Sequence, residues 1–290
     1  GDMGAMDMGI IKFDPSGVNR IYATYIGGRG NEQPHSLVVD ASGNLIIAGR
    51  TSSGNTYPVR GLSTYGPLGG LFDIVITKLN VTGSSIIGSV RMGGTSDDGV
   101  NIRPNYIRPQ GVESTRRNYG DDARSEVIVD GAGNIILASV TQSEDFRTTA
   151  GSFQTLPGKK TTTRFQDGVL VKMTPNLDAV IFSSFLGGGD DDAAFVIAKH
   201  PVNNQVYVAG ATSSANFPGD HNGTIGVSAN GGIDGFVAIL DQSGNVIKST
   251  FLGTSSTDII YGIQFDQNRA PLNNFPYVMG ISLGNWPVTG

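Results

Sequence analysis

The sequence predicts an all-β protein built from four copies of one repeat. Short stretches rich in β-branched and aromatic residues, such as 236–240, are typical of β-strands, and no segment keeps the 3.6-residue period of an amphipathic helix. Turn motifs rich in Asp, Asn and Gly, such as DASGN at 40–44 and DGAGN at 130–134, separate these stretches. Because the same order of strands and turns recurs along the chain, a repeat architecture is expected.

Each copy begins at an aspartate, and successive copies start 66, 94 and 67 residues apart, at Asp7, Asp73, Asp167 and Asp234. An Asp-led strand and a second strand ending near a Gly-Gly pair come first. Two further strands follow around an aspartate turn, and the copy stops at an aromatic residue, usually before proline. We therefore expect a single domain over 1–290, with repeats at approximately 4–61, 70–155, 164–219 and 231–290.

Four short strands in a core of about 50 residues match one blade of a β-propeller. The expected fold is thus a β-propeller, or a propeller segment, made of four repeats of four-stranded antiparallel blades. One aromatic position recurs in every copy, and we expect its side chains to plug the junctions between neighbouring blades. Its members are Tyr57, Phe146, Phe217 and Trp286.

The motifs carry a family resemblance over nearly the whole chain. The stretches IYATYIGG (21–28), VVDASGNLIIAGRTSS (38–53), DIVITKLNVTG (73–83) and ATSSANFP (211–218) resemble the bacterial SBBP-type β-propeller repeat, found in large secreted or surface proteins, many from Bacteroidota. The resemblance implies export and a role at the cell surface, in adhesion or gliding-associated secretion. The third and fourth copies depart from it at KHPVNNQ (199–205) and DQNRAPLNNF (266–275), which should alter two turns without removing the strands.

The order of strands leaves two arrangements open. If the strands around each aspartate turn are the inner pair of a blade, the chain starts with outer strands and ends with inner ones. Residues 7–28 can then complete residues 259–283 and close a four-bladed ring, which removes exposed sheet edges. Alternatively, the chain forms an arc of a longer propeller, and its ends lie apart.

Composition narrows the classes of function. The net charge of −5 and the pI near 5.1 argue against general nucleic-acid binding, and no run of 18 apolar residues exists to insert in a membrane. The absence of cysteine excludes disulfides and thiolate chemistry. The first 13 residues lack the basic start and apolar segment of a signal peptide. We therefore expect a mature portion, or a segment of a larger multidomain chain or assembly, located outside the cell or on its surface.

Two long loops of the second copy form the main candidate for ligand binding. They span 95–122 and 146–166, flank the same inner strand pair, and should therefore be neighbours on the irregular-loop face. Their arginines offer forked donors and their tyrosines offer stacking faces to an anionic glycan, a phosphate or an acidic protein. A solvated charged loop is the plainer reading. The candidate ligand-binding residues are Arg103, Tyr106, Arg108, Arg116, Arg117, Tyr119, Lys159, Lys160 and Arg164.

Acidic clusters recur after the Gly-Gly pairs and form a second candidate, for calcium, which prefers several oxygen ligands. The candidate metal ligands are Asp97, Asp98, Asp190, Asp191 and Asp192. None of the clusters has the spacing of a dedicated calcium loop, and the simpler explanation of the recurrence is turn capping, repeated because the blade is repeated. No other cofactor is expected.

Signals of catalysis are few. The histidines His35, His200 and His221 show no metal-ligand spacing, and no G-x-S-x-G motif occurs. We expect a non-catalytic scaffold or ligand-binding module of an exported bacterial surface protein, binding polysaccharide or a partner protein through the long-loop face. The alternative is a polysaccharide-acting hydrolase or lyase, which requires carboxylates that converge on that face.

Overall fold

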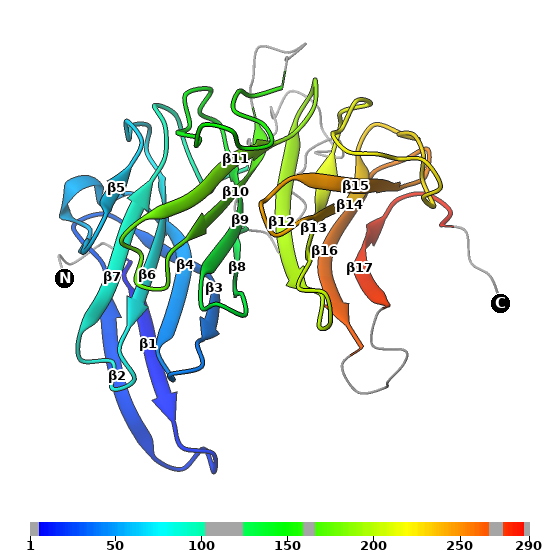
Figure 1. Ribbon diagram of the computed structural model, residues 1–290. Helices are drawn as coiled ribbons and strands as arrows, with labels where there is room; N and C mark the ends of the chain where they lie inside the picture. The colour runs from blue at the N-terminus through cyan, green and yellow to red at the C-terminus, as the bar shows by residue number, and fades with distance from the viewer. Residues whose placement is uncertain (1–5, 102–123, 159–165, 267–274, 287–290) are drawn as a thin grey trace.

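The computed structural model describes residues 6–101, 124–158, 166–266 and 275–286 (Figure 1). Over these ranges the chain forms seventeen β-strands and one short 3-10 segment, η1 (Gly54–Thr56), with no α-helix. The expected all-β class is therefore confirmed. In the described ranges, no helix of the length and apolar character needed to cross a membrane is found.

The strands are short, and most have six to eight residues. In chain order they are β1 (Met8–Phe13), β2 (Arg20–Ile26), β3 (Glu32–Val39), β4 (Leu45–Thr51), β5 (Ser63–Tyr65), β6 (Asp73–Leu79), β7 (Ile86–Met92), β8 (Glu126–Val129), β9 (Ile135–Thr141), β10 (Asp167–Met173), β11 (Val180–Leu186), β12 (Asp192–Lys199), β13 (Val206–Thr212), β14 (Asp234–Leu240), β15 (Val246–Leu252), β16 (Asp258–Phe265) and β17 (Pro276–Ser282).

Three larger sheets follow one another along the chain. Their strand orders are β3-β4-β6-β7, β8-β9-β10-β11 and β12-β13-β14-β15, all antiparallel, and β5 extends the first by pairing parallel with β7. We call these the whole sheets. Two-stranded sheets, β1-β2 and β16-β17, lie on either side of them, and we call these the half-sheets. The five sheets form an arc in Figure 1, and the four-stranded units fit the expected blades in size.

Every whole sheet combines strands from two successive repeats. The pairing of β4 with β6 joins the end of the first repeat to the start of the second, with Thr51 opposite Asp73. The same register places Thr212 opposite Asp234 in the third whole sheet. The leading aspartates of the second, third and fourth repeats thus lie on an inner strand of a whole sheet, and the chain crosses from one sheet to the next inside each repeat.

The chain is open at its two half-sheets. β1-β2 and β16-β17 are separate sheets, and Figure 1 shows them on opposite sides of the arc. Of the two arrangements that the sequence left open, the structure therefore has the arc, and the pairing of residues 7–28 with 259–283 within one chain is not formed.

The sheets pack face to face through apolar side chains. One cluster joins the first two whole sheets through residues that include Ile76, Leu137 and Val171, and another joins the second and third around Leu170 and Phe236. The first strands β3, β8, β12 and β16 contact one another in that order, so they define the inner side of the arc. Burial of these faces supplies the main stabilisation of the arrangement.

The turns between first and second strands confirm the role assigned to aspartate and glycine. Asp40 Oδ1 accepts the backbone NH groups of Ser42 and Asn44, both at 2.9 Å, and Gly43 adopts a positive φ of 80°. At the variant turn, His200 Nδ1 replaces the carboxylate as acceptor, and Asn204 takes a positive φ of 59°. Strands β12 and β13 still form around it, as expected.

The recurring aromatic position is buried in three of its four copies. Tyr57, Phe146 and Phe217 are 2–3% exposed, and Phe217 packs on Phe236 with ring centroids 4.2 Å apart. Trp286 is 38% exposed, contrary to the expectation. It follows a half-sheet, where third and fourth strands to cover it are missing.

Candidate functional site

One end of the arc collects the features that the sequence singled out. Because neighbouring strands are antiparallel, β3, β8, β12 and β16 begin at the end where β4, β9, β13 and β17 finish. The Gly-Gly connections and the segments after the second strands therefore share this end, which lies at the top of Figure 1 and which we call the loop face. The tight aspartate turns lie at the opposite end, which we call the turn face.

In every repeat a buried carboxylate lies at the loop face, four residues after the second residue of the Gly-Gly pair. In the fourth repeat this pair is Gly253-Thr254. The carboxylates are those of Glu32, Asp98, Asp192 and Asp258, each at most 3% exposed. In each case the carboxylate accepts the backbone NH of the residue four positions earlier, at 3.1, 2.8, 2.7 and 2.5 Å. We call these the capping carboxylates, because they fix the turn that leads into the first strand of a sheet.

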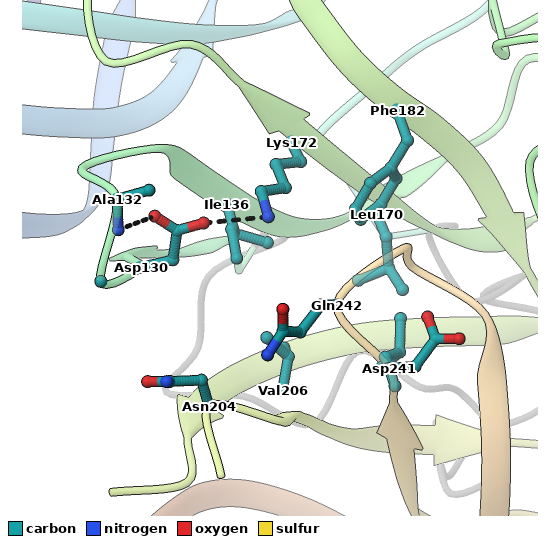
Figure 2. A pocket seen from close by; sticks show the side chains of 12 residues that line it. Asp130, Ala132, Ile136, Leu170, Lys172, Phe182, Asn204, Val206, Asp241 and Gln242 are labelled. Atoms are coloured by element: carbon teal, nitrogen blue, oxygen red, sulfur yellow. Dashed lines mark hydrogen bonds and ion pairs between the residues drawn. The ribbon is translucent and has the colours of Figure 1, made fainter. Parts of the chain in front are cut away.

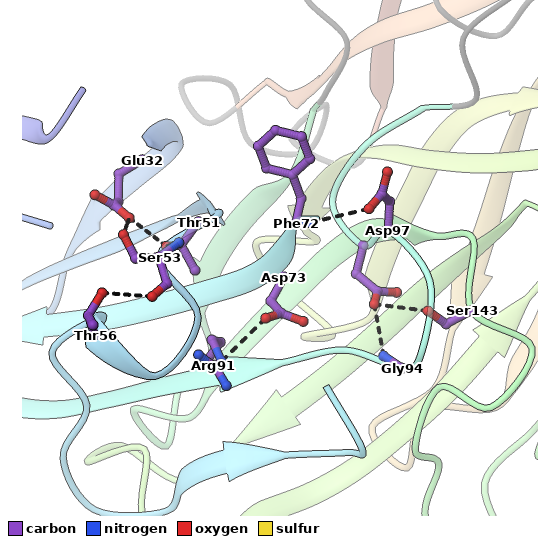
Figure 3. Close-up of polar contacts among 11 residues, drawn as sticks. Glu32, Thr51, Ser53, Thr56, Phe72, Asp73, Arg91, Gly94, Asp97 and Ser143 are labelled. Carbon is purple, nitrogen blue, oxygen red and sulfur yellow. Dashed lines mark hydrogen bonds and ion pairs between the residues drawn. The ribbon is translucent and has the colours of Figure 1, made fainter. Parts of the chain in front are cut away.

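Hydroxyl groups from the end of the second strand complete three of these caps. Glu32 Oε1 accepts the hydroxyls of Thr51 and Ser53, both at 2.5 Å, as Figure 3 shows. Asp98 accepts those of Thr141 and Ser143, and Asp192 accepts that of Ser214. The Thr-x-Ser that ends each of these second strands is thus a partner of the carboxylate, a pairing that the sequence alone did not show.

The leading aspartate of each repeat approaches the same turn from the third strand. A Cβ built on Gly93 falls 2.5 Å from Asp98 Oδ2 and 2.7 Å from Asp73 Oδ1, so two carboxylates face this one glycine. Burial raises the pKa of Asp98 to about 7 and that of Asp73 to about 6, although Arg91 lies 3.3 Å from Asp73 and opposes the second shift (Figure 3). Burial also raises the pKa of Asp234 in the third whole sheet.

These contacts explain the recurrence of the predicted calcium ligands. Asp98 and Asp192 are capping carboxylates, and Asp97 Oδ1 accepts the backbone NH of Leu71 at 2.6 Å. The backbone NH of Asp190 donates to Ser214 Oγ, and the carbonyl of Asp191 accepts from the backbone NH of Ser213. In the described ranges, no group of three or more His, Asp or Glu side chains is placed to hold a metal ion. The geometry here is that of turn capping.

The nine predicted ligand-binding residues lie outside the described residues, in 102–123 and 159–165. The described residues that flank these two segments nevertheless meet. Gln166 Nε2 donates to Asn101 Oδ1 at 3.4 Å and to the carbonyl of Asp192 at 3.2 Å. Residues 101 and 166, each adjoining one of the two segments, therefore lie close together.

A cationic cluster on the inner strands was not found from the sequence. His35 lies at the bulge of β3, and its Nδ1 is 3.1 Å from Ser125 Oγ at the start of the second whole sheet. Burial and the neighbouring Arg50 and Arg124 lower the pKa of His35 to about 3, so the ring is neutral at physiological pH. Arg124 Nη2 donates to the carbonyl of Tyr261 at 2.8 Å. The cluster thus brings together three sheets at the base of the loop face.

The signal for Arg50 was available within the repeat. The residue before the terminal threonine of the second strand is Val140 in the second whole sheet and Ala211 in the third, both fully buried. Arg50 occupies this position in the first whole sheet, is 9% exposed, and lies over the ring of Phe72. A charge at an otherwise apolar repeat position departs from the pattern, and we regard it as the clearest local sign of function.

A small pocket opens at the turn face between the second and third whole sheets. Its volume is about 180 Å³, below the range that is usual for small-molecule sites. Figure 2 shows an apolar floor that includes Leu170 and Val206, with the ion pair of Lys172 and Asp130 at its rim, 2.9 Å apart. The pocket has the character of a packing gap between sheets.

No family model and no curated protein sequence matches the chain. Among solved structures, a mutant apocarotenoid oxygenase of Synechocystis aligns with 89% of this chain at 12% identity and a TM-score of 0.37. The alignment covers 46% of that protein, so this chain spans about half its length. A likeness at this level carries no conclusion about fold or activity.

Proposed function

We propose that this chain is a β-propeller segment that acts as a non-catalytic binding module of an exported bacterial surface protein, and that its ligand is an acidic polysaccharide bound at the loop face. A partner protein with an acidic surface is the second ligand in keeping with this site. Export and the surface location rest on the resemblance to SBBP-type repeats described above. The propeller interpretation is supported by whole sheets whose first strands line one side of the arc.

The observation that carries the proposal is a pair of arginines packed at the base of the loop face of an acidic chain. Arg50 and Arg124 flank His35 at the base of the loop face. Asn101 and Gln166, which lie beside the two basic segments, meet each other there. Arginine binds carboxylate and sulfate groups through paired donors, and its charge does not change at any physiological pH. An anionic glycan is the class of ligand that fits such a surface.

Catalysis is the weaker alternative. A polysaccharide hydrolase or lyase needs two carboxyl groups that reach the substrate. The described carboxyl groups with a strongly raised pKa, Asp73 and Asp98, are 7% and 0% exposed and face a backbone turn. They hold the turn and cannot touch a sugar ring in this arrangement. Release of reducing ends from a panel of polysaccharides would support the enzyme over the binding module.

The test compares binding of acidic and neutral polysaccharides by the wild type and two charge-matched variants. One variant replaces Arg116, Arg117, Lys159 and Lys160 with Ala. The control replaces four basic residues away from the loop face with Ala, namely Arg20, Arg60, Lys199 and Lys248. We expect the first variant to bind acidic polysaccharide with an affinity at least about tenfold lower, which corresponds to about 1.4 kcal/mol of binding free energy. The control should keep the affinity of the wild type. Equal binding by all three proteins would remove the proposed site.

Binding by charge has a second signature. Interactions between exposed charges weaken with salt over a Debye length of about 8 Å at physiological ionic strength. Affinity for acidic polysaccharide should therefore fall as salt rises, and the fall should be shallower in the loop-face variant than in the control.

A further inference from the structure

The two half-sheets correspond to complementary halves of a whole sheet. β16-β17 has the position of first and second strands, with a bulge between Ile260 and Gly262 like that between Ala194 and Val196 in β12. β1-β2 has the position of third and fourth strands, with a shift at Lys12/Phe13 like that at Lys172/Met173 in β10. In the whole sheets the second and third strands pair along their full length, whereas the corresponding edges of β17 and β1 pair with no strand among the described residues.

We propose that β17 pairs antiparallel with β1 of a second copy of this chain. The two half-sheets then form one further whole sheet, with strand order β16-β17-β1-β2. The register follows from the other sheets, where the last residue of the second strand lies opposite the leading aspartate, as Thr51 does with Asp73. The equivalent residues are Ser282 and Asp7. Pairing therefore runs from Ser282 opposite Asp7 to Pro276 opposite Phe13. The inference is independent of what the loop face binds.

Burial in the whole sheets shows what the unpaired edges are missing. Met279 is 63% exposed, whereas the equivalent Ala48, Ala138 and Ala209 are fully buried. Phe13 is 55% exposed, and its equivalents Leu79, Met173 and Leu240 are at most 3% exposed. An exposed apolar edge strand is a template for addition of another strand. The side chains here already have the apolar character of the covered positions.

A charge pair supports the same register. In the first whole sheet Lys78 of β6 lies 2.7 Å from Asp40, the residue that follows the first strand, and Lys172 of β10 lies 2.9 Å from Asp130 in the second. In the third whole sheet both members change together, to Ile239 and His200. In the half-sheets, Lys12 of β1 is equivalent to Lys78, and Asp266, which follows β16, is equivalent to Asp40. Docking β1 on β17 brings this lysine to this aspartate, as in the first two sheets.

Aromatic size gives a third match. The recurring aromatic residues, which we call the junction aromatics, pack near the residue two positions after a leading aspartate. Phe217, for example, packs on Phe236 of β14, two positions after Asp234. In β1 this position is Gly9, which pairs with Tyr25 of β2, and Tyr25 is 78% exposed. The half-exposed Trp286 is the largest junction aromatic and would meet the smallest opposing residue. Docking therefore buries Trp286 against Gly9 and Tyr25.

A second copy, joined head to tail, accounts for both edges at once. Each chain supplies three whole sheets and two half-sheets. Two chains related by a two-fold axis therefore contain six whole sheets, and their four half-sheets pair to complete two more. The ring then has eight sheets. Propellers typically have about four to eight blades. Closed rings leave no unpaired edge, and two-fold dimers are the commonest oligomers. The assembly we infer is thus a two-chain ring.

Disulfide trapping tests the register. The chain has no cysteine, so Ile11→Cys and Val278→Cys introduce the only two thiols, at positions directly opposite in the proposed pairing. Directly opposed residues lie about 4.5–5.5 Å apart at Cα, within the range of a disulfide. The control combines Ile11→Cys with Tyr277→Cys, where a one-residue slip turns the second thiol to the other face.

On oxidation we expect the matched pair to give a covalent species of about twice the 30.3 kDa chain mass, and the control to remain a single chain. A disulfide within one chain would overturn the second copy as the occupant, since residues 7–28 would then close on their own chain. The absence of any matched cross-link would overturn the pairing itself. A ladder of larger species would overturn the two-chain ring.

Charge reversal tests the ion pair without cysteine. Lys12→Asp and Asp266→Lys should each weaken dimerisation by at least about tenfold, and the chain with both changes should recover it, because the pair is restored with opposite polarity. Lys248→Asp, on the outer strand β15, serves as the control and should leave dimerisation unchanged. Failure of the double variant to recover, in chains that melt like the wild type, would overturn the charge pair and its register.

Trp286 reports the same event in the unmodified protein, since it is the single tryptophan. Dilution through the dimer dissociation range should shift its emission to longer wavelength and increase quenching by iodide. An emission spectrum independent of concentration, alongside a monomeric mass by sedimentation, would overturn the proposal.

Discussion

The carboxylate of Asp98 accepts a hydrogen bond from Ser143 Oγ at 3.0 Å, across 45 residues of sequence. The contact fastens the turn that enters one strand to the end of the strand beside it. Its equivalents in the neighbouring sheets are Glu32 with Ser53 and Asp192 with Ser214. Burial raises the pKa of the Asp98 carboxyl, which links this cap to the pH dependence of stability.

We expect stability to fall as pH rises from about 4 to about 7. The pKa values of Asp98 and Asp73 are raised to about 7 and 6 from 3.8. The folded state therefore binds protons more tightly than the unfolded state, and the stabilisation present below pH 3.8 is lost as pH passes through 6 and 7. Asp98→Asn should flatten this slope, as measured by denaturant unfolding at a series of pH values. A slope unchanged by Asp98→Asn would contradict the assignment.

Acid should destabilise the fold by another route. The pKa of Asp40 is lowered to about 2 from 3.8, and hydrogen bonds from Lys78 and Asn44 are the main causes that overcome its desolvation. The pKa of Asp130 is lowered for the same reasons, with Asn134 and Lys172 as partners. Their stabilisation is present above pH 3.8 and is lost as pH falls toward 2. Together with Asp73 and Asp98, this predicts a maximum of melting temperature near pH 4.

Gly93→Ala should destabilise the fold by about 1–3 kcal/mol, the usual cost of overpacking. The new methyl group would lie 2.5 Å from Asp98 Oδ2 and 2.7 Å from Asp73 Oδ1. Gly232→Ala is the matched control, because a Cβ there meets nothing within 4 Å. The measurement is urea unfolding of both variants. Equal stability of the two would show that the turn can move away from the carboxylates.

Phe217→Ala should cost about 3–5 kcal/mol, as expected for a buried aromatic residue. Its ring is 2% exposed and packs on Phe236 and Phe251 of the third whole sheet, in the apolar cluster that joins this sheet to the second. Phe275→Ala, at a site 58% exposed, is the control and should change stability by less than about 1 kcal/mol. Loss of ligand binding with an unchanged melting temperature would instead place Phe217 in a binding site.

Lys172→Met alone should lower the free energy of unfolding more than Lys172→Met combined with Asp130→Asn. The two side chains form an ion pair at 2.9 Å and are 13% and 14% exposed. Removal of one member of a buried pair leaves the other charge uncompensated, which costs about 3–5 kcal/mol, whereas removal of both is often close to neutral. The third whole sheet, with His200 and Ile239 at these positions, tolerates such a replacement. The check is a double-mutant cycle by chemical denaturation, and equal costs for single and double variants would contradict it.

The sequence was sufficient to predict strands, turns and the recurring aromatic position, because these depend on local alternation and on turn chemistry. It could not decide which strands share a sheet. Thr51 opposite Asp73 pairs residues from two repeats, and the alternation pattern is compatible with pairing inside a repeat as well. The short parallel strand β5 had no sequence signal, since it has three residues.

The site was less predictable than the fold. His35 and Ser125 are 90 residues apart, and their contact depends on the packing of two sheets. The capping carboxylates looked like metal ligands because both roles call for clustered acidic residues near glycine. Only the hydroxyl and backbone partners distinguish the two, and the hydroxyl partners come from a different strand, 19 to 45 residues away.

The offset between repeats and sheets has a consequence for how such chains evolve. A duplication of one repeat adds the last half of one sheet and the first half of the next, so the new unit is fastened to both neighbours without new contacts having to arise. The two terminal half-sheets keep the same edges whatever the number of copies. A gain or loss of whole repeats therefore changes the number of sheets in the arc. The strand edges through which two half-sheets would pair stay the same.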